Sequence, residues 1–168
     1  MNTGQMMIGI FAISLLTMTV LNFNKDSLNT QDALIYNKEF ILATSIAASM
    51  LDEISGKAYD EEVVNGSAIF SAKDFSNSLK ADGGESYPNF DDVDDYNKFS
   101  KTDTIPQMGA FDVYVEVDYY TDALLKTSSR TYNKNITIRV TSDALVNFYT
   151  NKQDTLVVSS LLSQWAML

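Results

Sequence analysis

The stretch MNTGQMMIGIFAISLLTMTVLNFN, residues 1–24, contains no charged side chain, and Lys25 is the first charged residue of the chain. Such a stretch is a secretory signal, a membrane anchor or a helix that packs against other helices. A secretory signal is disfavoured because nothing basic precedes Met6 and no Ala-x-Ala cleavage site follows. As a helix rising about 1.5 Å per residue, residues 6–24 reach roughly 30 Å, which is enough to span the hydrocarbon of a bilayer.

Small or weakly polar residues are scattered through this apolar stretch. They are Gly9, Ala12, Ser14, Thr17 and Thr19. Residues of this kind let neighbouring helices approach each other closely. We therefore expect a helix that can lie in a membrane and that is suited to packing against other helices.

The helical pattern continues beyond the uncharged stretch. From Lys25 to Lys57 there is no Pro, and the only Gly is Gly56, at a position where a helix would end. Apolar residues recur at spacings that place them on one face of a helix. They are Leu28, Ile35, Leu42, Ala43, Ile46, Ala47, Met50, Leu51 and Ile54. The opposite face is expected to carry Asp32, Lys38, Glu39 and Asp52.

The sequence thus predicts one helix over residues 2–57, roughly 80 Å long, apolar on all sides at first and amphipathic afterwards. No compact domain of 168 residues is 80 Å across. The first half of this helix is therefore expected to project from the rest of the chain and to need partners.

The period of the pattern changes after Lys57. Residues 58–110 are rich in Asp, Ser, Asn and Gly, which predicts a mostly irregular loop with short ordered pieces. Apolar and polar residues then alternate in FDVYVEVDYY (111–120) and KNITIRVTS (134–142), the pattern of half-buried strands. Residues 154–168 are expected to form a third, more apolar strand.

Three consecutive strands with connections of about ten residues predict an antiparallel meander. The residues expected to face inward are Val113, Val115, Val117, Tyr119, Ile136, Ile138 and Val140. The helical stripe over residues 35–54 is the expected cover for this row. The predicted fold class is α+β, with a long N-terminal helix (1–57) packed on a globular loop-plus-sheet domain (58–168).

Composition argues against several classes of function. The chain has 12 basic and 22 acidic residues, and a net charge of -10 repels the phosphates of nucleic acids. It contains no His and no Cys, so the usual general base and any thiolate nucleophile are missing. There is also no Gly-rich phosphate loop and no Gly-x-Ser-x-Gly motif. We expect no enzymatic activity and no nucleic-acid partner.

One acidic segment is a candidate metal site. Residues 90–96, FDDVDDY, place Asp91, Asp92, Asp94 and Asp95 close together in the sequence. Such hard oxygen ligands suit Ca²⁺. The spacing is not that of an EF-hand, because the Gly and the terminal Glu are absent. The alternative is that these aspartates cap a short helical turn or face water. No other cofactor is expected.

The chain resembles type IV pilins and pseudopilins in layout and in three segments. MNTGQMMIGIFAISLL (1–16) resembles the pilin N-terminus, and ATSIAASMLDEISGKAYDE (43–61) resembles the end of the long helix in minor pilins and pseudopilins. PNFDDVDDYNKF (88–99) is similar to a loop segment of minor pilins of the mannose-sensitive haemagglutinin type. The resemblance covers the first 60 residues well, the loop segment moderately and the sheet only by topology. It also implies calcium, which some pseudopilins hold in their sheet domain.

The N-terminus departs from the pilin pattern. If Met1 begins the mature chain, as we expect, Gln5 occupies the fifth place, where pilins usually carry a glutamate that offsets the terminal amine of a neighbouring subunit. If cleavage instead follows Gly4, the fifth place falls on Gly9. Asn22 and Asn24 stand near the position where many pilins have a kinking Pro.

The resemblance implies a structural subunit of a bacterial type IV pilus-like filament, held in the inner membrane and then assembled at the cell surface. Copies would polymerise through the apolar helix, with the help of pilus or secretion assembly machinery. Its candidate assembly residues are Gln5, Ile8, Phe11, Ile13, Leu16 and Val20. The alternative is a minor pilin or pseudopilin that primes assembly or acts in a type II secretion-like apparatus. A third possibility is an unrelated single-span module that binds a partner through its sheet domain.

Overall fold

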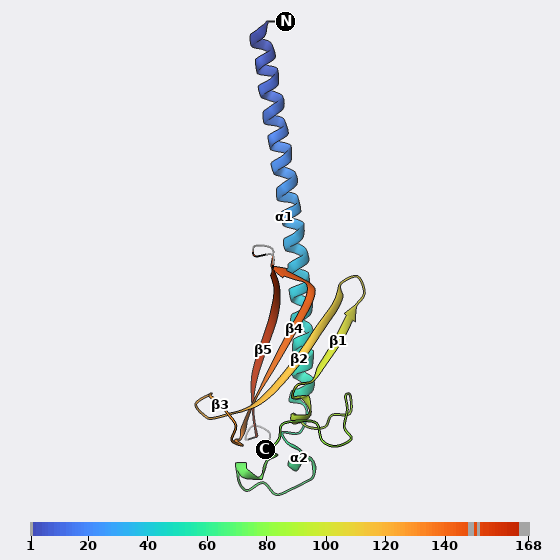
Figure 1. Cartoon of the computed structure of the whole chain (residues 1–168), viewed down its shortest axis with the longest axis vertical. Coiled ribbons are helices and arrows are strands. Elements are labelled where there is room, and N and C mark those ends of the chain that lie inside the picture. The colour runs from blue at the N-terminus through green and yellow to red at the C-terminus, as the bar shows by residue number, and fades with distance from the viewer. Residues whose placement is uncertain (1, 148–149, 151, 165–168) are drawn as a thin grey trace.

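The computed structural model describes residues 2–147, 150 and 152–164. Its longest element is α1 (Thr3–Ser55), a helix of 53 residues, roughly 80 Å long at 1.5 Å per residue. The backbone N–H of Gly56 donates to the carbonyl of Asp52 at 3.1 Å, and the helix ends there. The prediction of one helix over residues 2–57 is confirmed to within two residues at each end. Figure 1 shows the N-terminal half of α1 extending beyond every strand.

An antiparallel sheet packs beside the C-terminal half of α1 (Figure 1). Its strands are β1 (Ser100–Ile105), β2 (Gly109–Tyr120), β3 (Lys126–Thr127), β4 (Asn133–Asn147) and β5 (Lys152–Ser163). The strand order is β1-β2-β4-β5, and the short β3 pairs with the end of β2. The predicted α+β, pilin-like fold class, with a long N-terminal helix on a C-terminal antiparallel sheet, is confirmed.

The predicted strands lie where the alternation placed them. All seven residues expected to face inward from β2 and β4 are buried. The third predicted strand corresponds to β5, and its last four residues, 165–168, lie outside the described residues. The prediction of a loop over residues 58–110 is wrong at its end, because residues 100–105 form β1. The sequence of β1, SKTDTI, alternates in burial but has a single apolar residue, so hydrophobic periodicity does not reveal it.

Only part of the predicted helical stripe contacts the sheet. The buried residues of α1 are Glu39, Ala43, Ala47, Met50 and Ile54. Leu28 and Ile35, which both precede the hydrogen bond from Tyr36 to Asp154 of β5, stay 61% and 55% exposed. Glu39 was expected on the polar face, and that expectation is wrong. Spacings of three and four place Glu39 on the same face as Ala43, so it is buried against the sheet.

The segment between α1 and β1 contains three short helices. They are α2 (Glu61–Val64) and the 3₁₀ helices η1 (Ala72–Asp74) and η2 (Asp94–Tyr96). The Tyr96 ring lies 4.9 Å from the Phe90 ring, and its hydroxyl donates to Glu53 Oε1 of α1 at 2.8 Å. These contacts fix η2 against the last turns of α1. The acidic segment around η2 is therefore part of the packed domain.

Candidate functional sites

The first candidate site is the exposed N-terminal half of α1. From Asn2 to Ile35, every described residue except Asn29 is exposed. An 18-residue window of this helix has a mean hydropathy of 2.0 and none of it is buried. By length and composition, α1 can therefore cross a membrane.

Twelve large apolar side chains on this segment are between 49% and 72% exposed. They are Met6, Met7, Ile8, Ile10, Phe11, Ile13, Leu15, Leu16, Met18, Val20, Leu21 and Phe23. Monomeric soluble proteins rarely leave an apolar surface of this extent in water. The candidate assembly residues Ile8, Phe11, Ile13, Leu16 and Val20 are all among them, and Gln5 is exposed beside them.

These candidate residues do not form one narrow stripe. At about 100° of rotation per residue, Phe11 and Ile13 project from different sides of the helix. A helix that is apolar on all sides is one that is surrounded on all sides, by lipid or by other helices. The geometry thus indicates a segment enclosed by its surroundings and not one laid along a single groove.

The hydroxyl groups of this segment are satisfied within the helix. Ser14 Oγ donates to the Ile10 carbonyl at 2.9 Å, and Thr17 Oγ1 donates to the Ile13 carbonyl at 2.9 Å. Thr19 Oγ1 makes the same bond to the residue four positions earlier, at 2.8 Å. A polar group that already has a partner costs little to remove from water. These three residues are therefore compatible with a dry environment.

The second candidate site is the acidic segment, which the structure divides into two groups. Asp94 Oδ1 lies 2.6 Å from Lys134 Nζ, and Asp60 Oδ2 lies 2.9 Å from the same nitrogen. The Lys134 side chain is fully buried and also donates to the Tyr59 carbonyl at 2.6 Å. Its ammonium lies 4.3 Å from the centre of the Tyr59 ring, a cation–π contact. Lys134 thus supplies the positive charge that Asp60 and Asp94 need.

The electrostatic state of this buried group follows from its partners. Burial opposes ionisation of Asp60, but the charge of Lys134 and hydrogen bonds from Lys134 and Ser76 outweigh it and lower the pKa of this carboxyl. Burial raises the pKa of Asp94, and the charge of Lys134 opposes that rise. Asp60, Asp94 and Lys134, the inner group, form a structural ion-pair network at the junction of η2, α2 and β4.

Asp92 acts as a cap for η2. Its Oδ1 accepts the backbone N–H groups of Asp94, at 2.7 Å, and Asp95, at 3.1 Å. In return, Asp95 Oδ2 accepts the N–H groups of Asp91, at 3.1 Å, and Asp92, at 3.3 Å. This is the capping arrangement weighed against calcium for the segment.

The structure therefore does not bring the four predicted ligands together around one point. Asp92 caps η2, and Asp94 pairs with Lys134. Asp91 and Asp95 instead belong to an outer group that also contains Glu61 and Glu85. Carboxylate oxygens of Glu61, Glu85 and Asp91 lie within 4.8 Å of one another, a spacing that could hold a metal ion. Sequence reasoning missed both glutamates because Glu61 is 30 residues from Asp91 and Glu85, although only six residues away, lies outside the acidic FDDVDDY segment.

Lys134 was also missed, although the sequence contained a signal. Alternation places residues 134, 136, 138 and 140 on the same side of β4, and Ile136, Ile138 and Val140 were expected inward. A Lys on the inward row of a strand requires a buried acidic partner. That argument, applied to the sequence, predicts the buried ion pair.

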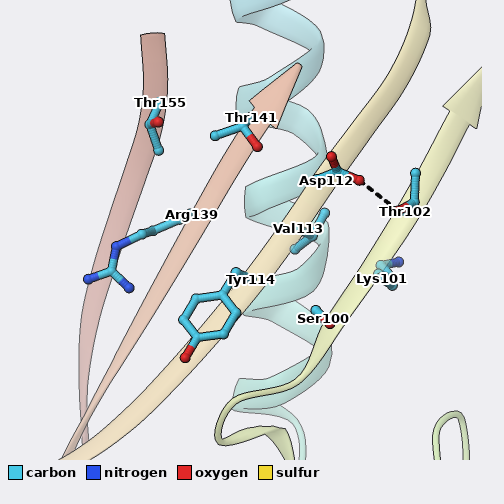
Figure 2. Close-up of a pocket in the computed structure, with 9 residues that line it drawn as sticks. All are labelled: Ser100, Lys101, Thr102, Asp112, Val113, Tyr114, Arg139, Thr141 and Thr155. Carbon is cyan, nitrogen blue, oxygen red and sulfur yellow. Dashed lines mark hydrogen bonds between the residues drawn. The ribbon is translucent and has the colours of Figure 1, made fainter. Parts of the chain in front are cut away.

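The outward face of the sheet carries a shallow hollow of about 680 Å³ (Figure 2). Its lining residues are Ser100, Lys101, Thr102, Asp112, Val113, Tyr114, Arg139, Thr141 and Thr155. Figure 2 shows Thr102 and Asp112 facing each other across β1 and β2, joined by a hydrogen bond of 2.6 Å. Arg139 pairs with Glu116 at 2.9 Å. The hollow offers hydroxyl groups, an aromatic ring and a paired cation on an open surface.

Comparison of the chain with family models, with curated proteins and with solved structures found no match.

Proposed function

We propose that this chain is the structural subunit of a type IV pilus-like extracellular filament that polymerises through the N-terminal half of α1. The observation that carries the proposal is the projecting helix itself, which is exposed over nearly all of residues 3–35 and has no charged side chain before Lys25. The N-terminal half of α1, residues 3–35, is called the stalk from here on. Because the stalk projects from the sheet domain, its apolar side chains can be buried only by other molecules that pack around it.

The magnitude of the exposed surface supports this reasoning. Fully burying a Val, Leu, Ile, Phe or Met side chain contributes about 1.5–3 kcal/mol. Twelve such side chains on the N-terminal half of α1 are 49% to 72% exposed. Their burial therefore stands to contribute on the order of 10–25 kcal/mol. The stalk needs an apolar environment at every stage of the protein's life.

Two environments fit the same helix in succession. Before assembly, residues 6–24 cross the inner membrane, and Lys25 and Asp26 begin the charged part of the helix outside the hydrocarbon. After assembly, the stalks of neighbouring copies replace the lipid and the sheet domains face outward. The exchange is decided by van der Waals fit, since lipid tails are as apolar as the helix.

Features of the stalk favour helix contacts over lipid contacts. Apart from its chain neighbours and the backbone of its own helix, no atom lies within 4 Å of the position that a Cβ on Gly9 would take, so this notch is open to a neighbour. Ala12 and the internally bonded Ser14 and Thr17 are also small. Small residues bring helix backbones close, which raises the packing energy per unit length.

The sheet domain leaves room for such packing. The Tyr36 hydroxyl of α1 donates to Asp154 Oδ2 of β5 at 2.8 Å. About 33 residues precede this point on α1, a length of roughly 50 Å. Neighbouring helices can surround this length without meeting the sheet domain of the same subunit.

The proposal is tested by shearing cells that produce the protein and analysing the sheared material by electron microscopy and mass spectrometry. A main structural subunit should be the dominant protein in the fibres. A trace amount in fibres made of another protein would instead indicate the minor pilin or pseudopilin role. Extraction by detergent as a monomer from cells without fibres would indicate an anchored module, and would contradict the proposal.

A further inference from the structure

Lys134 holds a primary amine in the interior of the sheet domain. Its side chain is fully buried, and so are the carboxyl groups of Asp60 and Asp94 beside it. Nζ lies 2.6 Å from Oδ1 of Asp94 and 2.9 Å from Oδ2 of Asp60. A carbonyl C–O bond is about 1.2 Å long, so Cγ of Asp94 is no more than about 3.8 Å from Nζ. The amine and this carboxyl carbon are therefore close to the distance of about 3–3.5 Å at which two groups react.

The surroundings of this amine exclude water. Nζ lies 4.3 Å from the centre of the Tyr59 ring and 5.3 Å from the centre of the Tyr119 ring. Both tyrosines are buried. Nζ also donates to the Tyr59 carbonyl at 2.6 Å, which fixes the position of the amine. Charge is costly in such an environment, so a reaction that removes charge is favoured there.

The two carboxyl groups beside Lys134 differ in their partners. Asp60 accepts the backbone N–H of Ser76 at 2.9 Å, the Ser76 hydroxyl at 2.8 Å and the Tyr119 hydroxyl at 3.3 Å. Although burial opposes its ionisation, Lys134 and Ser76 lower the pKa of Asp60. Among the described residues, no backbone N–H or hydroxyl donates to Asp94, and burial raises its pKa. Asp94 is thus suited to be a neutral carboxylic acid, and Asp60 to be a carboxylate.

We propose that Lys134 and Asp94 condense to an amide, an isopeptide bond between Nζ and Cγ that joins β4 to η2. Asp60 takes one proton from the Lys134 ammonium, which frees the lone pair of Nζ. Nζ then attacks Cγ of the neutral Asp94 carboxyl, and the C–N bond forms. Asp60 passes a proton from the nitrogen to the Asp94 hydroxyl, which leaves as water when the C–O bond breaks.

The reaction balances without any further reactant. One ammonium, one carboxylic acid and one carboxylate become one amide, one water and the protonated form of Asp60. The net charge of the group stays the same, and nothing is oxidised or reduced. The separate positive and negative charges are replaced by neutral groups, which suits the buried site.

Held geometry and the exclusion of water distinguish this pair from ordinary ion pairs. Groups held in a reacting arrangement behave as if one were present at about 10⁵–10⁸ M. Lys126 Nζ lies equally close to Asp118 Oδ2, at 2.6 Å, but these side chains are 57% and 25% exposed. Water solvates Lys126 and Asp118 as ions. They form an internal control that should stay uncondensed.

The bond would close a covalent loop from η2 through β1, β2 and β3 to β4. The chain has no Cys, so a disulfide cannot supply such a cross-link. By the argument that applies to disulfides, a cross-link restricts the unfolded chain and stabilises the folded domain. The bond lies within the sheet domain and does not depend on how α1 assembles. A failure of filament formation and the absence of this bond are therefore separate results.

The test begins with the intact mass of the full-length chain, purified in detergent micelles and then denatured. Denaturation separates an ion pair but leaves an amide intact. The folded and purified chain should be lighter by one water than the mass calculated for its own sequenced termini. Lys134→Arg keeps the positive charge but replaces the amine with a guanidinium, so this variant should have its full calculated mass.

Digestion with trypsin then locates the bond. Trypsin does not cleave after an acylated lysine, so residues 131–139 should remain in one peptide and be joined to residues 81–98, which contain Asp94. Tandem mass spectrometry should place the link between Lys134 and Asp94. Cleavage after Lys126 should be normal. An aspartate that forms a succinimide also loses water, but it does not join two peptides.

Two variants test the role of Asp60 against a matched control. Asp60→Asn keeps the size of the side chain but removes the proton acceptor, so the bond should form about 10²–10⁴-fold more slowly. The cross-linked fraction is measured at successive times after cell-free synthesis into detergent micelles. Lys57→Arg changes a nearby lysine that donates to the Phe90 carbonyl, and it should leave the rate unchanged. Near-ultraviolet circular dichroism of the tyrosines checks that each variant is folded.

Four results would contradict parts of this proposal or all of it. A folded, unsubstituted chain that keeps its full mass after prolonged incubation would overturn it, and so would a loss of water that joins no peptides. A link from Lys134 to Asp60, in residues 58–73, would overturn the assignment to Asp94. An unchanged rate in folded Asp60→Asn would overturn the role of Asp60 in proton transfer.

Discussion

Replacing Ile13 with Asp tests whether the stalk lines a tightly packed core. Ile13 is near the middle of the uncharged stretch, and its side chain is 66% exposed on the isolated chain. The first charged residue of the sequence is Lys25, roughly 18 Å away along the helix axis. A carboxylate introduced at residue 13 would therefore have no partner within its own helix.

We expect Ile13→Asp to weaken membrane insertion without abolishing it. An Asp at the centre of a membrane helix costs about 2.5–3.5 kcal/mol on insertion scales. The eight other Leu, Ile, Phe and Val side chains exposed between residues 8 and 23 contribute about 0.3–0.6 kcal/mol each, or roughly 2.5–5 kcal/mol together. These two quantities nearly balance, so membrane association should persist at least in part.

The expected effect on assembly is much larger. In a filament, the carboxylate recurs in every subunit inside a dry core, close to its copies and without a cation. Each copy adds a desolvation penalty of several kcal/mol that no new contact offsets. Fibres should disappear from the sheared fraction while the protein remains in the membrane fraction on flotation.

Two controls separate charge in the core from other effects. Ile13→Ala removes the side chain without adding charge and should reduce the yield of fibres without abolishing them. Ser159→Asp adds the same charge on an exposed position of β5, opposite Thr137, and should leave both membrane association and fibres intact. Normal fibres from Ile13→Asp would refute the reasoning, because residues 6–23 could not then line a packed core.

Three further predictions concern the sheet domain and use its melting temperature. Lys134→Met strands two buried carboxylates and should destabilise the domain by about 3–5 kcal/mol, seen as a Tm at least 10 °C lower; an unchanged Tm would mean that the ion pairs are not formed. Glu39→Leu removes a buried carboxylate oxygen that has no partner and should raise Tm, whereas a lower Tm would show that Glu39 has a partner. Burial first, and then Asp95, raise the pKa of Asp92 to about 7, so its contribution to stability is greatest at low pH and is lost as the pH rises from about 4 to 7. In EDTA, Tm should fall over that range, and Asp92→Asn, which keeps an accepting oxygen, should flatten the fall.

Periodicity explains which parts of this fold the sequence predicts. The inward rows of β2 and β4 are buried as expected because apolar side chains repeat there with the period of a strand. The helix is likewise found over its whole length, since Pro is absent and its apolar residues keep the helical spacing. Periodicity fails at β1, where polar side chains alternate and only Ile105 is apolar. It fails at Glu39 because polarity alone says nothing about which face a charged residue takes.

The acidic site shows a second limit of reasoning from neighbours in the chain. Four aspartates within five residues predict a single site if closeness in sequence means closeness of carboxylates. The turn of η2 instead directs Asp94 inward to Lys134 and leaves Asp91 on the outside with Glu61 and Glu85. These partners come from segments that only the folded chain brings together. Inward alternation in β4 could still have identified Lys134.

A helical reconstruction of sheared fibres by electron cryomicroscopy tests the central claim most directly. The account predicts that residues 3–35 of neighbouring copies pack against one another along the fibre axis, with the sheets on the outside and no aqueous channel between the helices. Ile13 should be fully enclosed by other subunits. Fibres joined through their sheet domains, with the N-terminal half of α1 pointing outward or held in lipid, would contradict the account.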